Sequence, residues 1–226
     1  MVDASVGGKT GVDLGPLKNQ IGVINQPEMV LIDTHYLNTL EDRQLQSGFA
    51  EMLKHGLIQD SEYWETLKGI NSFNKIDAFV YTSVSIKNVV VLEDPTEQNL
   101  RKILNFGHTL GHAVESYFLE NPNKETLLHG EAIAVGMVLE AYLSYKLTGL
   151  SKEVLDDIKV TFLSRYPKVS FTTNDIDAIL SLLKFDKKNS HGNINFVLLK
   201  GIGEPVIDVK IPSDLYLEAF AYYKDQ

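Results

Sequence analysis

The sequence contains no cysteine, so disulfide bonds and metal sites built on thiolates are excluded. A chain without cysteine is consistent with the reducing cytoplasm, where we place the protein. The first residues show no basic-then-apolar signal pattern, and no apolar run approaches the roughly 18 residues of a membrane span. We therefore expect no membrane partner.

Cations are in the minority, with 21 Lys and Arg against 30 Asp and Glu and a formal net charge of −9. Such a balance argues against a nucleic-acid-binding surface. The 226 residues are 44% hydrophobic and 23% charged, which is typical of a globular protein with a sizeable core. An acidic chain can still bind a small anion if its few cations converge.

The segment GGKTG at residues 7–11 suggests the phosphate loop of an NTPase. That loop needs a further glycine five residues before its Gly-Lys-Thr and a strand that leads into it. Asp3 occupies the glycine position, and no strand can precede it within this sequence. An NTPase is therefore excluded, and these residues need another explanation.

Apolar residues recur at helical spacing through most of the chain, and this pattern predicts a mainly α domain. Residues 1–27 are rich in Gly, Asn, Pro and Gln and are expected to form loops, followed by a short strand at 29–33. Two β-rich runs around Gly-Ile-Gly predict a small hairpin at 193–211. Thr96 and Ser213 are the expected N-caps of two helices. The predicted helices cover residues 41–59, 61–70, 75–91, 96–118, 128–149, 151–165, 172–184 and 213–225.

The predicted helix at 96–118 carries polar residues on one face. His108 and His112 are four apart, and Arg101 and Asn105 precede them at helical spacing on the same face. Gly107 and Gly111 stand beside the histidines, although glycine weakens a helix by roughly 1 kcal/mol relative to alanine. We therefore expect something to approach this face closely.

Two further residues raise the prospect of a metal site. His129 opens the next predicted helix, and Glu51 is a carboxylate inside an apolar helical pattern, with Lys54 and His55 nearby. Two histidines and one carboxylate from three helices would form an open zinc site with a position for water or substrate. From the residues alone, a metal site and an exposed polar face both remain open.

Five stretches together resemble one family. SVGGKTGVDLGPLKNQIG, GFAEMLKHGLI, EDPTEQNLRKILNFGHTLGHAVE, HGEAIAVGM and FDKKNSHGNINFVLLKGIG occur in the order found in 3-dehydroquinate synthases and span nearly the whole chain. The resemblance implies that residues 1–226 form the helical metal- and substrate-binding domain. Residues 1–27 would be an interdomain, phosphate-binding segment. The NAD-binding N-terminal domain of the family would be missing.

The resemblance also implies a role for individual residues. Glu51, His108 and His129 would bind zinc or cobalt, and His112 would act as the acid/base at the oxidised hydroxyl. Glu97 would orient Arg101. Lys54 would hold a substrate hydroxyl or the carboxylate side. The remaining implied contacts are Lys87 and Arg101 to the substrate carboxylate; Lys9, Asn19, Asn105 and either Lys187 or Lys188 to its phosphate; and Asp3 and Lys9 near the cofactor.

The family is a group of NAD- and zinc-dependent lyases of the shikimate pathway, which leads to chorismate and the aromatic amino acids. Its members convert 3-deoxy-D-arabino-heptulosonate 7-phosphate, a sugar-acid phosphate, into 3-dehydroquinate with loss of phosphate, usually as homodimers. Because the cofactor-binding glycine turn is absent, we expect weak or no turnover by this chain alone.

Three alternatives stand beside this interpretation. The first is a sibling sugar-phosphate cyclase, such as a 2-deoxy-scyllo-inosose synthase or a valiolone synthase. The second is a metal-dependent alcohol dehydrogenase relative. The third is a helical metal-binding domain without activity.

Overall fold

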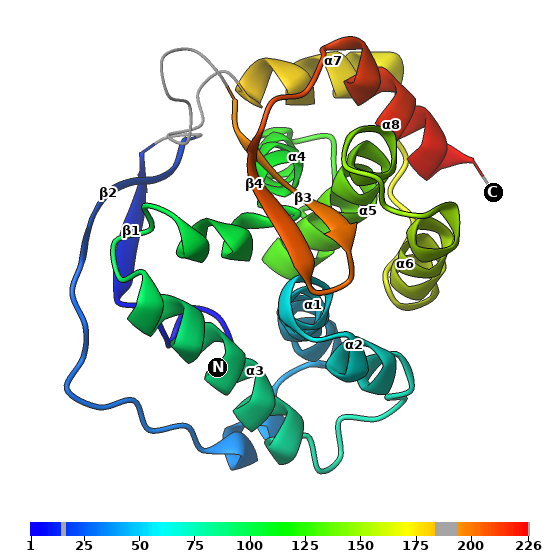
Figure 1. The fold of residues 1–226 in the computed structure, drawn as a ribbon. Helices are drawn as coiled ribbons and strands as arrows, with labels where there is room; N and C mark the ends of the chain where they lie inside the picture. The colour runs from blue at the N-terminus through cyan, green and yellow to red at the C-terminus, as the bar shows by residue number, and fades with distance from the viewer. Residues whose placement is uncertain (15–16, 184–193, 226) are drawn as a thin grey trace.

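The computed structural model describes residues 1–14, 17–183 and 194–225 (Figure 1). Its centre is the helix α5 (His129–Leu147), which is apolar on every side, as expected for a helix buried all round. Other elements pack around α5 on several sides. They are α1 (Asp42–Gln59), α4 (His108–Glu120), α6 (Lys152–Arg165), α8 (Asp214–Lys224) and the strand β3 (Phe196–Gly201).

The other elements form the periphery of this core. The helices are α2 (Ser61–Lys68), α3 (Asp77–Glu93) and α7 (Thr173–Leu182), with two 3-10 helices, η1 (Thr34–Thr39) and η2 (Leu100–Asn105). The mainly α fold predicted from the sequence is therefore confirmed. None of the helices in the described part of the chain is both long and apolar enough to cross a membrane.

The predicted helix at 96–118 is wrong, because the structure divides this segment into η2 and α4. Gly107 separates the two with a φ of 78°, in the left-handed region that favours glycine. Arg101 and Asn105 consequently lie in η2, apart from the α4 face that carries the histidines. Thr96 caps neither helix, and instead the carboxylate of Asp94 accepts the backbone N–H groups of residues 98, 99 and 101.

Both ends of the chain differ in part from expectation. The C-terminal hairpin of β3 and β4 (Glu204–Val209) is confirmed, but Ser213 makes no side-chain cap to α8. At the N-terminus, β1 (Lys9–Leu14) and β2 (Leu17–Ile24) form an antiparallel hairpin where loops were expected.

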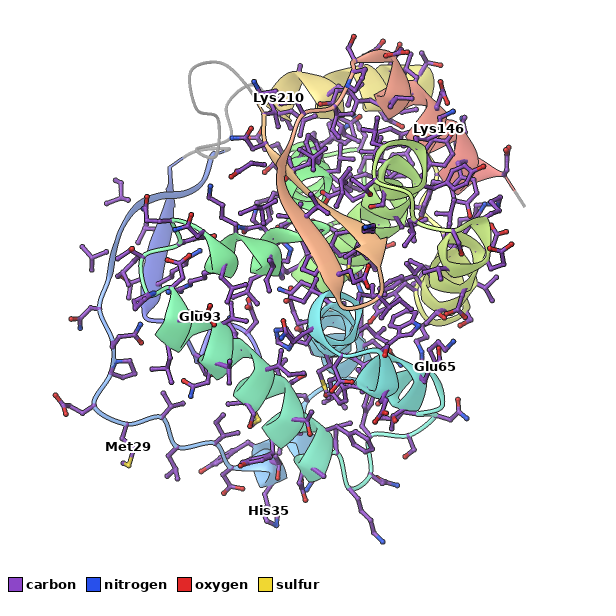
Figure 2. The ribbon with its side chains drawn as sticks, viewed as in Figure 1. Met29, His35, Glu65, Glu93, Lys146 and Lys210 are labelled. Carbon is purple, nitrogen blue, oxygen red and sulfur yellow. The ribbon has the colours of Figure 1, made fainter. Side chains whose placement is uncertain are left out.

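The expected strand at 29–33 is also wrong, because these residues form no strand in the structure. They belong to an extended connection between β2 and η1. The side chain of Met29 points away from the rest of the molecule there (Figure 2). The prediction failed because an apolar run can form a strand only beside a second strand, and residues 29–33 have no such partner in the described structure.

Candidate metal centre and its surroundings

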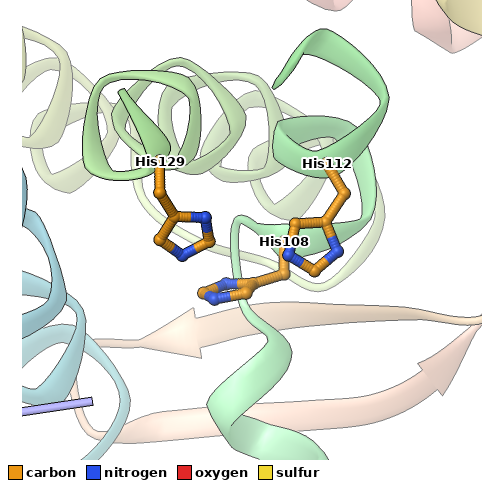
Figure 3. A group of neighbouring side chains, drawn as sticks. All are labelled: His108, His112 and His129. Carbon is orange, nitrogen blue, oxygen red and sulfur yellow. The ribbon is translucent and has the colours of Figure 1, made fainter. Parts of the chain in front are cut away.

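Two helix starts bring three imidazoles together. α4 begins at His108 and carries His112 one turn later, and α5 begins at His129 (Figure 3). The ring centroids are 5.2 to 5.7 Å apart, and one nitrogen from each ring lies within 4.8 Å of the others. The structure therefore places three sequence-predicted site residues in one cluster.

Glu51, on α1, reaches the same cluster. Its Oε1 atom is 3.4 Å from Nε2 of His108 and 3.3 Å from Nε2 of His129, and it is buried without a hydrogen-bond partner. Ligands about 2.1 Å from a tetrahedral zinc ion are about 3.4 Å from one another. Each nitrogen is therefore spaced from this oxygen as two ligands of one divalent metal would be, and this donor set suits zinc or cobalt.

A second carboxylate borders the cluster. One oxygen of Asp3 lies within 4.8 Å of ligand atoms on Glu51 and His129. His129 thus belongs to two overlapping groups, one with the other histidines and one with the carboxylates. Distances alone therefore admit either His112 or Asp3 as a further ligand.

The charges of the cluster depend on each other. Burial opposes ionisation of Glu51, but the charges of Lys54 and His108 hold its pKa well below the usual range. Burial and the neighbouring Lys54 lower the pKa of His108 to about 4. Burial also opposes the charged form of His129, yet Glu115 and Glu51 raise its pKa to about 10. Glu115 and Glu51 therefore stabilise a positive charge at the position of His129, which lies between them.

Two lysines predicted to hold substrate lie beside the cluster. Lys54 is fully buried and forms an ion pair with the second oxygen of Glu51. Lys87, on α3, forms an ion pair with Asp3 and also donates to its carbonyl oxygen. Burial lowers the pKa of Lys87, although Asp3 opposes this effect. Asp3, Lys54 and Lys87 thus join the metal cluster to the N-terminal loop.

Lys9 and Asn105 meet at a different carboxylate. Lys9, on β1, forms an ion pair with Glu97, and Nδ2 of Asn105 donates to Glu97 Oε1 over 2.6 Å. Glu97 has a φ of 60°, which is uncommon for a residue other than glycine. Two groups expected to bind phosphate are therefore close together and already hold one anion.

Arg101 is buried between backbone carbonyls. Its Nη1 donates to Pro95 O over 2.7 Å and its Nη2 to Gly7 O over 2.6 Å, while Nε is buried without a partner. Asn19 lies in β2, and its side chain is outside the described part of the structure. Lys187 and Lys188 are outside the described residues altogether.

The glycines of α4 have a different role from the one expected. A Cβ at Gly111 would lie 2.7 Å from Cδ1 of Ile133, and a Cβ at Gly136 would lie 2.0 Å from the carbonyl oxygen of Gly107. The close approach predicted from the sequence is thus real, but α5 makes it. This packing brings the helix that carries His108 close to the helix that begins at His129.

Sequence reasoning missed two residues that support His129. Glu115 Oε2 lies 3.2 Å from Nδ1 of His129, and Arg43 holds Glu131, in the first turn of α5, through two hydrogen bonds of 2.7 and 2.8 Å. Glu115 follows His108 by seven residues, which is two helical turns. That spacing on one face could have indicated it.

Comparison with known proteins decides the family. The family model described as 3-dehydroquinate synthase C-terminal matches residues 48–189, and the one described as 3-dehydroquinate synthase N-terminal matches residues 1–47. The chain belongs to the 3-dehydroquinate synthase family. The resemblance seen in the sequence is therefore confirmed.

Curated 3-dehydroquinate synthases are similar over nearly the whole chain. The enzyme of Parabacteroides distasonis is 41% identical over 99% of this chain, and that of Rippkaea orientalis is 39% identical over 95%. The matched regions cover 64% and 60% of those proteins, so the chain spans less than two thirds of their length.

Solved structures of sibling cyclases share the family fold. A 2-deoxy-scyllo-inosose synthase complexed with carbaglucose-6-phosphate, NAD+ and Co2+ matches with a TM-score of 0.81 and 25% identity, over 98% of this chain and 63% of that one. A 2-epi-5-epi-valiolone synthase from Streptomyces hygroscopicus with NAD+ and Zn2+ matches with a TM-score of 0.79 and 26% identity, over 98% and 62%.

Proposed function

We propose that this chain forms the metal- and substrate-binding part of a 3-dehydroquinate synthase. The complete enzyme would convert 3-deoxy-D-arabino-heptulosonate 7-phosphate into 3-dehydroquinate, a carbon–oxygen lyase reaction that depends on NAD and a divalent metal. The observation that carries the proposal is the buried, unsatisfied Oε1 of Glu51 facing two imidazole nitrogens. The names of the relatives support the substrate.

Glu51, His108 and His129 are the proposed ligands of zinc or cobalt. The metal, when bound, supplies an electrophile that stabilises negative charge on a substrate oxygen. The assignment is supported by two distances, because Nε2 of His108 and Nε2 of His129 lie 3.4 and 3.3 Å from Oε1 of Glu51. His112 is one turn beyond His108 and half-buried, which leaves it for proton transfer at the substrate hydroxyl.

The polar residues proposed to bind substrate fall into two groups, one for each end of the molecule. Lys54, Lys87 and Arg101 are proposed for the carboxylate end and its neighbouring hydroxyls, because they contact either the metal cluster or the N-terminal loop that carries Asp3. Lys9, Asn19, Asn105 and one lysine of 187–188 are proposed for the phosphate. Lys9 and Asn105 both contact the carboxylate of Glu97, so they are close enough to bind one anion together.

We propose that NAD binding needs residues beyond those of this chain. The sequence contains no Gly-x-Gly-x-x-Gly turn, the usual fingerprint of dinucleotide binding. Asp3 and Lys9 are the proposed contributions of this chain to a cofactor held mainly by other residues. We therefore propose that residues 1–226 belong to a two-domain enzyme, dimeric as is usual in the family, and turn over weakly or not at all alone.

Metal analysis of the purified chain tests the centre of this proposal. The chain should bind one equivalent of zinc or cobalt, and His108→Ala should abolish this stoichiometric binding. Full retention of metal by the variant would overturn the ligand assignment. Vigorous NAD-dependent cyclisation by the chain alone would overturn the predicted need for a second domain.

A sibling sugar-phosphate cyclase is the second candidate, since solved sibling structures match with TM-scores of 0.79 to 0.81. Each sibling substrate should be assayed alongside the heptulosonate phosphate after an N-terminal domain from a 3-dehydroquinate synthase relative has been joined to the chain. Preference for the heptulosonate phosphate supports the first candidate, and preference for another sugar phosphate supports the second.

A further inference from the structure

The N-terminus of α4 has no cap within its own sequence. The N-cap residue is Gly107, which has no side chain to accept the first backbone N–H groups of the helix. Its left-handed φ of 78° makes a capping serine or aspartate unfavourable there. Since His108 is the first residue of this helix, the uncapped turn is the one that presents a proposed metal ligand.

Glu140 supplies the missing cap from another helix. Its Oε2 accepts the N–H of Gly107 over 2.6 Å, and its Oε1 accepts the N–H of Leu110 over 3.1 Å. These two N–H groups lie on either side of His108 in the chain. One carboxylate in the middle of α5 therefore fixes the backbone before and after a proposed ligand.

A carboxylate at this place is costly unless it has such partners. Glu140 is fully buried, and a charge removed from water needs hydrogen bonds or an opposite charge. The N-terminus of α4 offers both, because its free N–H groups carry the positive end of the helix dipole. An apolar side chain would avoid the burial of a charge but would remove the acceptor of the Gly107 and Leu110 N–H groups, so the glutamate meets a need that packing alone does not.

The packing around Glu140 holds the two helices in one register. Gly136, one turn earlier on α5, lies against the carbonyl oxygen of Gly107, and Met137 lies against the backbone of Gly107. These contacts leave no room for α4 to approach further, while Glu140 prevents its first turn from withdrawing. The start of α4 is thus held from both directions.

We propose that Glu140 is a positioning residue for the metal centre: it caps α4 from within α5 and so sets the imidazole of His108 against Glu51 and His129. The ligand assignment rests on the proposed function, but the capping of α4 by Glu140 does not. The two parts can therefore be tested separately.

The experiment compares the full chain with Glu140→Gln and Glu140→Leu. Amide hydrogen exchange is measured at Gly107 and Leu110, and cobalt affinity is measured by titration of the visible absorption of Co2+. Glu140→Leu should speed exchange at both amides at least about tenfold. It should also weaken cobalt binding about 10- to 100-fold, as expected for the loss of an outer support of a metal ligand. Glu140→Gln retains one acceptor oxygen, so its exchange rates and cobalt affinity should lie between those of the wild type and those of Glu140→Leu.

Ser144→Ala is the matched control. Ser144 is buried one turn further along α5, and its hydroxyl donates to Glu140 O and accepts from Leu199 N, so the variant loses buried hydrogen bonds without touching α4. It should lower stability but leave both amides and cobalt affinity within about twofold of the wild type. Equal effects in the control and in Glu140→Gln would reduce Glu140 to a structural role and overturn the proposal.

Two other outcomes are equally decisive. If Glu140→Leu does not fold, Glu140→Gln carries the comparison, and unchanged exchange together with unchanged cobalt affinity in that variant overturns the proposal. If the wild type binds no cobalt, the proposed metal centre fails. The exchange rates then still decide whether Glu140 holds the start of α4.

Discussion

Glu115 Oε2 lies 3.2 Å from Nδ1 of His129, the ring nitrogen opposite the one that faces Glu51. A carboxylate on the second nitrogen fixes the orientation of a ligating imidazole and increases its basicity. We predict that Glu115→Ala weakens zinc binding about 10- to 100-fold. Competition with a chromophoric chelator would measure the change.

Glu120→Ala is a suitable control, because Glu120 lies on the same helix at its exposed C-terminal end. It should bind zinc as the wild type does. If both variants lose affinity equally, the effect comes from the helix as a whole and Glu115 has no special role.

A second prediction concerns the carboxylate between Lys9 and Asn105. Glu97 occupies the two groups proposed to bind phosphate, so Glu97→Gln should release Lys9 and remove a like charge. The side chain of Lys9 is 49% exposed, and such a pair contributes roughly 1 kcal/mol or less. We therefore expect inorganic phosphate to bind up to about fivefold more tightly, as measured by calorimetry.

Glu93→Gln removes the same charge from an exposed position on α3 and should leave phosphate affinity nearly unchanged (Figure 2). Equal tightening in both variants would show a general charge effect. Weaker binding by Glu97→Gln would contradict the competition between Glu97 and phosphate and would instead make Glu97 part of the support for Lys9.

The third prediction tests the packing of α4 on α5. A Cβ at Gly136 would meet backbone atoms of Gly107 and Gly111 at 2.0 and 2.7 Å, and neither can move without shifting a helix. Gly136→Ala should therefore lower the free energy of unfolding by at least about 2 kcal/mol. A Cβ at Gly48, in α1, would meet nothing within 4 Å, so Gly48→Ala should raise it by about 0.5–1 kcal/mol. Urea unfolding would show these opposite signs.

Gly107 and Gly111 show how far the sequence could predict the site. Their presence indicated a close approach, but a sequence cannot say whether a ligand or another helix approaches. The left-handed φ of Gly107 was equally hidden, and it divides one predicted helix into two. Arg101 and Asn105 were therefore placed on the wrong face, because their spacing from His108 has helical meaning only if the helix is continuous.

Helices with their own local signals were predicted well. α5 has a continuous apolar pattern, and α7 begins with a capping box between Thr172 and Asp175. Glu115 and Glu140 act across helices, so their roles depend on which elements become neighbours. The N-terminal hairpin was missed for a related reason, since Gly and Asn in that segment favour turns and the pairing of its strands is a tertiary outcome.

The last prediction concerns stability and pH at Asp175, which joins α4, the following loop and α7. Its carboxylate accepts hydrogen bonds from Lys124 Nζ, Tyr117 OH and Thr172 N over 2.7, 2.5 and 2.7 Å. Burial alone would raise the pKa of Asp175, but the bonds from Lys124, Tyr117 and Thr172 outweigh it and hold the pKa well below the usual value.

A depressed pKa stabilises the fold above the unfolded-state value of about 3.9, and this contribution is lost as the pH falls through the lower, folded-state value. Asp175→Asn should therefore lower the free energy of unfolding by about 2 kcal/mol at pH 7, with the difference narrowing below about pH 4. Asp177→Asn, an exposed change on the same helix, should have little effect at either pH. A difference between wild type and Asp175→Asn that stays constant in urea unfolding from pH 7 to pH 3 would show that Asp175 acts through packing and not through its charge.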